Sequence, residues 1–180
     1  MEPDPVDRLL LDELVDLPDG RIAVVDDDTG ALAGALRDLA GERVIAHSTS
    51  LLAERRVAAT GVATAPDLAG ALTGAALVVL RLPASLDALD EVARTAALLG
   101  TPDVRIVAGA RVKHMTPSMN DVLGASFEQV RASLGRQKSR VLHAADPAGV
   151  GHADHHRHRE RAAGAIAQLG DVRDDLFERG

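Results

Sequence analysis

Hydrophobic residues in this chain alternate between short continuous runs and longer stretches in which they recur every three or four positions. Continuous aliphatic runs are typical of strands buried on both faces of a parallel sheet, and the three-to-four spacing is typical of amphipathic helices. Aliphatic runs lie at residues 22–25, 44–46, 77–80 and 104–108, with a weaker one at 62–64. Helical spacing follows at residues 31–41 and begins again near Thr49, Ser85 and Thr116. The pattern predicts an α/β fold with a doubly wound, mostly parallel sheet.

Two of the helices carry clear boundary signals. The first has Asp4 as its N-cap and Pro5 at its first position, and its apolar stripe is Val6, Leu9, Leu10, Leu14 and Leu17. The helix beginning at Thr116 has Pro117 next and is predicted to continue to Gly135, with one apolar face made of Met119, Val122, Leu123, Phe127, Val130 and Leu134. A last strand is expected at about residues 138–144.

Length and composition indicate one globular domain with a tail. The 180 residues include no cysteine, 46% are hydrophobic, and no apolar run has the length of a membrane span. We expect a domain at residues 1–145 and a flexible, histidine-rich linker with a short helical tail at residues 146–180. The acidic N-terminus lacks the layout of a secretory signal, and the absence of cysteine fits a reducing compartment, so a cytoplasmic location is expected.

Charge is distributed unevenly along the chain. Its net value is -7, which argues against a protein that coats nucleic acid over its whole surface. Residues 1–30 carry ten acids against two arginines, whereas residues 111–140 carry six cations against Asp121 and Glu128. One region of the chain is therefore acidic and another is basic.

The acidic turn "VVDDDTG" at residues 24–30 follows the first predicted strand, where open parallel sheets bind ligands. A phosphatase of the haloacid dehalogenase type, a receiver domain and a class I methyltransferase all place acids here. The first would need Gly-Thr where the chain has Thr29-Gly30, and the second a phosphorylatable Asp where it has Arg81-Leu82-Pro83. The third would need more glycines. The remaining interpretation, which the residues favour, is that the acids cap the next helix.

The segment "AGARVKHMTPSMNDVLGASFEQVRASLGRQKSRVLHA" at residues 108–144 is the most distinctive part of the sequence. Within it, Arg136, Lys138 and Arg140 alternate, and in an extended segment they would lie on one side about 7 Å apart. Such a row can follow a phosphate backbone. A solvated edge strand whose charges prevent aggregation explains the same spacing equally well.

The motifs "RVKHMT" and "ASLGRQKSRVL" within residues 5–145 resemble the N-terminal domain of the two-domain ribosomal RNA guanine-amino methyltransferases, in particular actinobacterial members. The resemblance implies a Rossmann-like, degenerate class I methyltransferase fold. In that family the N-terminal domain helps to position RNA, while the C-terminal domain binds S-adenosylmethionine and carries an Asn-Pro-Pro-aromatic motif. This chain has Arg81-Leu82-Pro83-Ala84 at the equivalent place, and a second methyltransferase domain is not evident after Ala144.

The resemblance therefore implies the RNA-recognition or structural half of a ribosomal RNA (guanine) methyltransferase. We expect no catalytic, cofactor-binding or metal-binding residues in this chain, with S-adenosylmethionine bound by the family's catalytic domain. The expected partners are ribosomal RNA and a catalytic methyltransferase domain, with no membrane and no required metal. The residues expected to contact RNA are Arg111, Lys113, His114, Arg131, Arg136, Lys138 and Arg140.

Two alternatives remain open at this point: a small active S-adenosylmethionine-dependent methyltransferase, and a receiver-like or protein-interaction domain. The histidines at 152, 155, 156 and 158 have the spacing of metal ligands on a helix, yet a solvated run with adventitious metal affinity is favoured because matching acids or cysteines are missing nearby.

Overall fold

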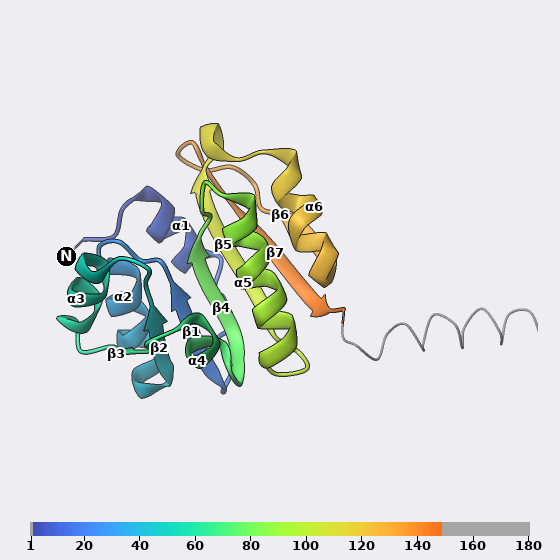
Figure 1. Ribbon diagram of the computed structural model, residues 1–180. Helices are drawn as coiled ribbons and strands as arrows, with labels where there is room; N and C mark the ends of the chain where they lie inside the picture. Colours follow the sequence, from blue (N-terminus) through green and yellow to red (C-terminus); the bar gives the residue numbers. More distant parts are fainter. Residues whose placement is uncertain (1, 149–180) are drawn as a thin grey trace, which may run out of the picture. The chain divides into compact units, whose positions relative to one another are not determined.

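The computed structural model of the chain describes residues 2–148, which form one seven-stranded sheet with helices on both faces (Figure 1). The strand order is β3-β2-β1-β4-β5-β7-β6. The strands are β1 (Arg21–Val25), β2 (Val44–His47), β3 (Ala63–Thr64), β4 (Ala75–Arg81), β5 (Arg105–Arg111), β6 (Phe127–Ala132) and β7 (Ser139–Pro147). Strands β1 to β5 pair in parallel, whereas β7 is antiparallel to both β5 and β6. The predicted doubly wound, mostly parallel α/β fold is confirmed.

Within residues 2–148, six helices cover the sheet. They are α1 (Pro5–Asp12), α2 (Ala31–Ala40), α3 (Leu51–Ala58), α4 (Leu68–Leu72), α5 (Leu86–Leu99) and α6 (Pro117–Ser126), with 3-10 turns at Gly41–Arg43 and Val112–His114. Helices α5 and α6 lie side by side over β4, β5 and β7 in Figure 1. In the part of the chain that the structure describes, no helix has both the length and the apolar character needed to cross a membrane.

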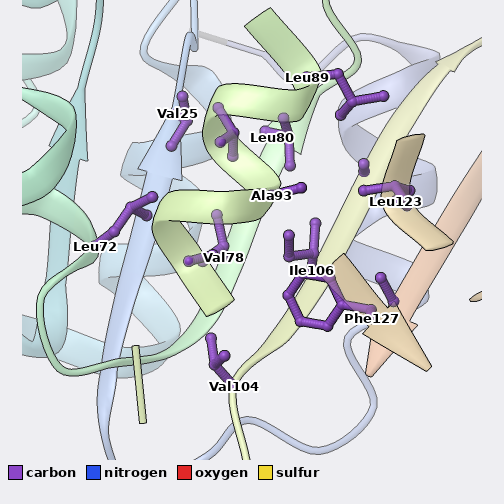
Figure 2. Close-up of a cluster of buried hydrophobic side chains, with 14 of the residues drawn as sticks. Val25, Leu72, Val78, Leu80, Leu89, Ala93, Val104, Ile106, Leu123 and Phe127 are labelled. Carbon is purple, nitrogen blue, oxygen red and sulfur yellow. The ribbon is translucent and has the colours of Figure 1, made fainter. Parts of the chain in front are cut away.

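The strands bury both of their faces, which explains the continuous aliphatic runs in the sequence. In β1, Ile22 and Val24 face the core formed with α1 and α2, while Ala23 and Val25 face the core formed with α4, α5 and α6. Figure 2 shows the second of these cores, in which the ring of Phe127 joins aliphatic side chains from α5 and the central strands. Two separate cores therefore hold the sheet in place.

Helix α1 is fixed by the cap that the sequence predicts. The Asp4 carboxylate accepts hydrogen bonds from the N–H groups of Val6 and Asp7 at 2.8 and 3.0 Å, and the Asp7 side chain accepts one from the N–H of Asp4. Leu10 packs against the sheet at Gly109, where a Cβ atom would lie 2.8 Å from the Leu10 Cγ. Glycine at this position of β5 thus lets α1 approach the sheet closely.

The helix predicted from Thr116 to Gly135 is wrong in its second half. Helix α6 ends at Ser126, and Phe127 begins β6, which pairs with β7 from Phe127↔Pro147 to Ala132↔Leu142. Pairing with β6 satisfies the backbone groups on the edge of β7 that faces away from β5, so tertiary structure overrides the helical spacing. Leu134, placed on the buried face by that spacing, is 82% exposed.

Candidate functional site

The strand order reverses between β1 and β4, so the carboxyl ends of these two strands mark the place where an open α/β sheet binds ligands. The acidic turn Asp26–Asp28 follows β1 at this place, and Arg81 is the last residue of β4. The position of both groups agrees with the sequence prediction of a ligand crevice. Their contacts decide whether the crevice is open.

Asp27 is directed into the protein and caps α2. It is 1% exposed, and its Oδ1 accepts hydrogen bonds from the N–H of Gly30 at 2.9 Å and from the N–H and hydroxyl of Thr29 at 3.1 Å. Its Oδ2 accepts a hydrogen bond from the N–H of Ala33 at 2.9 Å. The N–H of Ala31 donates to the Thr29 hydroxyl at 3.2 Å. The donors at this helix start are thus used by the protein's own side chains.

The other two acids of the turn also have structural contacts. Asp26 adopts a φ of 53° and accepts hydrogen bonds from the N–H and hydroxyl of Thr49, which ties the turn to the segment after β2. The carbonyl of Asp28 accepts a hydrogen bond from Arg56 at 3.0 Å. The capping interpretation therefore holds for Asp27 alone, and the three carboxylates have no hydrogen-bond partner in common.

Arg81 closes the crevice from the side of β4. Its guanidinium donates to Asp4 Oδ2 and Asp7 Oδ1, both at 2.9 Å, so it joins the end of β4 to the start of α1. Burial raises the pKa of the Asp7 carboxyl, although Arg81 opposes the shift. Burial also acts to raise the pKa of Asp4, but the N–H of Asp7 and the Arg81 guanidinium outweigh it and the net shift is downward. A half-buried cation bonded to two acids therefore lies at the end of β4, beside the switch point.

The residues at this point do not fit S-adenosylmethionine. A methyltransferase crevice needs glycines that let the backbone approach the cofactor and an acid after the second strand. Gly30 serves another purpose here, because a Cβ atom on it would lie 2.8 Å from the carbonyl oxygen of Arg56 in α3. Strand β2 ends in His47, whose Nδ1 lies 3.3 Å from the carbonyl oxygen of Ala65.

The cations expected to contact RNA gather mainly at the carboxyl end of β5. Arg111 pairs with Ser139 and Ala110 with Arg140 across the β5–β7 ladder, and the N–H of Val112 donates to the carbonyl of Lys138 at 2.9 Å. These contacts bring the end of β5 against the turn that precedes β7. We define the cationic cluster as Arg111, Lys113, Arg136, Lys138 and Arg140, with His114 beside it; all six side chains are exposed.

The expected straight row of Arg136, Lys138 and Arg140 is wrong in its geometry. Arg136 and Ser139 exchange two backbone hydrogen bonds of 2.9 and 2.8 Å, and between them Gln137 and Lys138 have φ values of 50° and 60°. This is a tight two-residue turn of the kind that closes hairpins, so the three cations surround its tip. The sequence does not reveal this turn, because its two central residues are neither Gly nor Asn, the residues usual at these positions.

Within the part of the chain that the structure describes, the side chains of the cationic cluster lack the ion-pair and carbonyl partners that most other arginines of the molecule have. Among the described residues, none of its five cations forms an ion pair with an acid. Elsewhere arginines hold the structure together by donating to carboxylates or carbonyls: Arg8, Arg21, Arg37, Arg43, Arg56, Arg81, Arg94 and Arg105. The cluster thus leaves its donors available to an external partner.

Arg131 lies apart from the cationic cluster. It pairs with His143 in the β6–β7 ladder and lines a pocket of about 380 Å³ together with Glu13, Arg105 and His143. The imidazole Nε2 of His143 lies 2.9 Å from Glu13 Oε2. Burial lowers the pKa of His143, Glu13 opposes this, and the charges of Arg131 and Arg105 add to the lowering.

A larger pocket, of about 600 Å³, opens beside the cationic cluster. It lies between the end of β4, the end of β5 and the start of α6, and it was not identified from the sequence. The signal available there was the run Arg81-Leu82-Pro83-Ala84, which lines one wall. Because the opposite wall comes from residues more than 25 positions later, spacing in the sequence could not reveal the pocket.

Within residues 2–148 no group of three or more His, Asp or Glu side chains is placed to hold a metal ion. The histidines at 152, 155, 156 and 158, like the whole segment predicted to be a linker and tail, lie outside the described residues.

Comparison with known proteins gives one family and one fold. The family model for the RLMG N-terminal domain matches residues 4–148. Ribosomal RNA large subunit methyltransferase G of Pseudomonas syringae pv. tomato is 32% identical over 158 residues, and that of Pectobacterium atrosepticum is 28% identical over 148 residues. These alignments cover 78% of this chain but only 40% and 39% of the relatives, so the chain spans about 40% of their length.

Solved structures support the same fold. The T. thermophilus 16S rRNA methyltransferase RsmC, solved in complex with AdoMet and guanosine, superposes with a TM-score of 0.64 at 22% identity over 81% of this chain and 40% of that chain. A TehB-like SAM-dependent methyltransferase from Corynebacterium glutamicum gives a TM-score of 0.59 at 13% identity, covering 79% of this chain and 89% of that one. At these identities the likeness concerns the fold alone.

Proposed function

Because the chain belongs to the RLMG N-terminal domain family, we propose that it is the RNA-recognising, non-catalytic half of an S-adenosylmethionine-dependent ribosomal RNA guanine methyltransferase. Its partners are then ribosomal RNA and a catalytic methyltransferase domain, which binds the cofactor. A cytoplasmic location is part of this proposal, and ribosomal RNA as the substrate supports it. The relatives' names and the 40% of their length that this chain spans support the division of labour.

One contrast carries the proposal. The crevice where a methyl donor would bind is occupied by Asp27 bonded to α2 and by Arg81 bonded to Asp4 and Asp7. At the same end of the sheet, the cationic cluster has exposed charges without ion pairs among the described residues. Cations at such spacing neutralise phosphates and release counterions, which gives affinity for nucleic acid without chemistry.

The salt dependence of RNA binding tests the proposal. We expect the 180-residue chain to bind a fluorescently labelled RNA hairpin with an affinity that falls as salt rises. The variant Arg136→Ala/Lys138→Ala/Arg140→Ala should lose about 2 from the slope of log K against log salt, if each cation contacts one phosphate of a single strand. Fluorescence anisotropy at several salt concentrations measures that slope.

A matched control removes the same charge elsewhere. Arg55 is exposed on α3, and Arg37 and Arg94 form exposed ion pairs with Glu42 and Asp90, so Arg37→Ala/Arg55→Ala/Arg94→Ala changes the net charge equally at residues outside the cationic cluster and the pockets beside it. Equal slopes for the two triple variants would contradict the proposal. Heat released on titration of the chain with S-adenosylmethionine would instead favour an active methyltransferase.

A further inference from the structure

The pocket of about 600 Å³ beside the cationic cluster has the size and lining of a small-ligand site. Leu82, Pro83 and Met119 supply apolar walls, and Thr116 and Ser118 add hydroxyl groups. Neither hydroxyl makes a hydrogen bond to another described residue. The pocket therefore pairs apolar surface with donors and acceptors that await a partner.

The charges of the pocket select the ligand class. No Asp or Glu is among the residues that line it, whereas Arg111 and His114 are. Arg81 also lines it, but its charge is balanced by Asp4 and Asp7 on the side of α1. A ligand that enters this pocket meets apolar side chains and the charge of Arg111 with no acid in the lining, which suits a molecule that combines an apolar ring with an anionic group.

The pocket is continuous with the cationic cluster because Arg111 belongs to both. Ala110 lines the pocket and pairs in the β5–β7 ladder with Arg140, so a second cation of the cluster lies next to the opening. A phosphate backbone that follows Arg136, Arg140 and Arg111 would pass directly over the mouth. A base within a duplex would first have to be unpaired and unstacked to enter, whereas a base in a loop or single strand can enter without that cost.

We propose that this pocket takes one unpaired nucleotide of the bound RNA, with the base against Leu82, Pro83 and Met119 and its phosphate on Arg111 and Arg140. This inference rests on the proposed function and adds a specificity to it: the domain prefers single-stranded or looped RNA over duplex. The hydroxyls of Thr116 and Ser118 hydrogen-bond the edge of the base. Because the chain lacks Trp and Tyr, the base packs against aliphatic side chains in place of an aromatic platform.

Filling the pocket tests the inference. Ala84, after β4, and Ser118, in the first turn of α6, are exposed residues that line the pocket, so Ala84→Leu/Ser118→Leu occupies the space without burying a polar group. The matched control, Ala58→Leu/Asn120→Leu, changes two exposed residues that do not line the pocket. Affinity for an RNA hairpin with a single-stranded loop should fall about tenfold in the filled variant, the value of one inserted base. Affinity for a fully paired duplex of the same stem should not change.

A second measurement uses the unaltered protein. Hairpins in which each loop nucleotide in turn is abasic should include one that binds about tenfold more weakly, and the filled variant should lose this discrimination. Equal losses for loop and duplex, or no loss in the filled variant, would overturn the inference while leaving the proposed RNA binding intact. Absence of any RNA binding by the unaltered chain would overturn both. Displacement of the loop RNA by free S-adenosylmethionine would assign the pocket to the cofactor and overturn the inference as well.

Discussion

The guanidinium of Arg81 donates a 2.9 Å hydrogen bond to the carboxylate of Asp7, which comes 74 residues earlier in the chain. This contact joins the end of the central strand β4 to the first turn of α1, and Asp4 accepts a second bond from the same guanidinium. The same ion pairs therefore stabilise the fold and lie at the place where a cofactor would bind.

Removal of Arg81 should cost the protein much more than removal of a surface arginine. Arg81→Met leaves Asp7, 1% exposed, buried without its cation, and we expect the free energy of unfolding to fall by about 3 kcal/mol. Arg94→Gln breaks an exposed pair with Asp90 and should cost less than about 0.5 kcal/mol. Urea unfolding followed by circular dichroism measures both. Similar losses in the two variants would show that the buried pair is not a stabilising connection.

Asp27 and Asp28 should differ although they are neighbours. Asp27→Ala removes the acceptor for the N–H groups of Gly30 and Ala33, and we expect a loss of about 1 to 2 kcal/mol in the free energy of unfolding. The Asp28 side chain is exposed, and Asp28→Ala should change it by less than about 0.5 kcal/mol. Thermal and urea unfolding of the two variants gives the comparison. A larger effect at Asp28 would contradict the capping role.

Stability should rise with pH through the titration of His143. Burial lowers the pKa of His143 below its usual value of 6.5, so the folded protein binds this proton more weakly than the unfolded chain does. The stabilisation is present above pH 6.5 and is lost as the pH falls from about 6.5 through the folded-state pKa. His143→Gln does not titrate and should flatten this dependence, whereas His114→Gln, at an exposed site, should retain it. Unfolding curves between about pH 5 and pH 7.5 provide the measurement. An unchanged dependence in His143→Gln would contradict the assignment.

The end of α6 can be tested by two substitutions on the face that helical spacing predicts. Phe127 is 1% exposed and packs in the core of Figure 2, so Phe127→Ala should lower the free energy of unfolding by about 3 to 5 kcal/mol. Leu134, seven residues later, is 82% exposed, and Leu134→Ala should change it by less than about 0.5 kcal/mol. A large loss at Leu134 would favour the continuous helix over strand β6.

The sequence predicts those parts of the fold in which local pattern and tertiary environment agree. The buried strands appear as aliphatic runs, and α1 is identified by Asp4 and Pro5, because caps and two-sided burial leave a local trace. Strand β6 is missed because Phe127 and Val130 also fit the spacing of a helix. The segment forms a strand because it pairs with the free edge of β7. Tertiary pairing of this kind is absent from any local window.

The candidate site divides in the same way. The cations of residues 111–140 are apparent from the sequence, whereas the cap for α2 predicted for the acidic turn is made by Asp27 alone, from a buried position. The sequence cannot show that Arg81 finds Asp4 and Asp7, because those acids precede it by more than seventy residues. It also cannot separate Arg131 from the cationic cluster, since its place beside His143 depends on the register of β6 on β7.

Gln137 and Lys138 both adopt left-handed backbone conformations, and at Lys138 this conformational strain falls on a residue whose charge belongs to the cationic cluster. Each such residue costs about 1 to 2 kcal/mol relative to glycine, and Lys138 is at once a strained residue and a member of the cationic cluster. Glycine at 138 would therefore relax the hairpin at the expense of a charge, whereas glycine at 137 would relax it and keep the lysine. Gln137→Gly is therefore the substitution to use when this domain is stabilised for structural work, and Lys138 should be left unchanged.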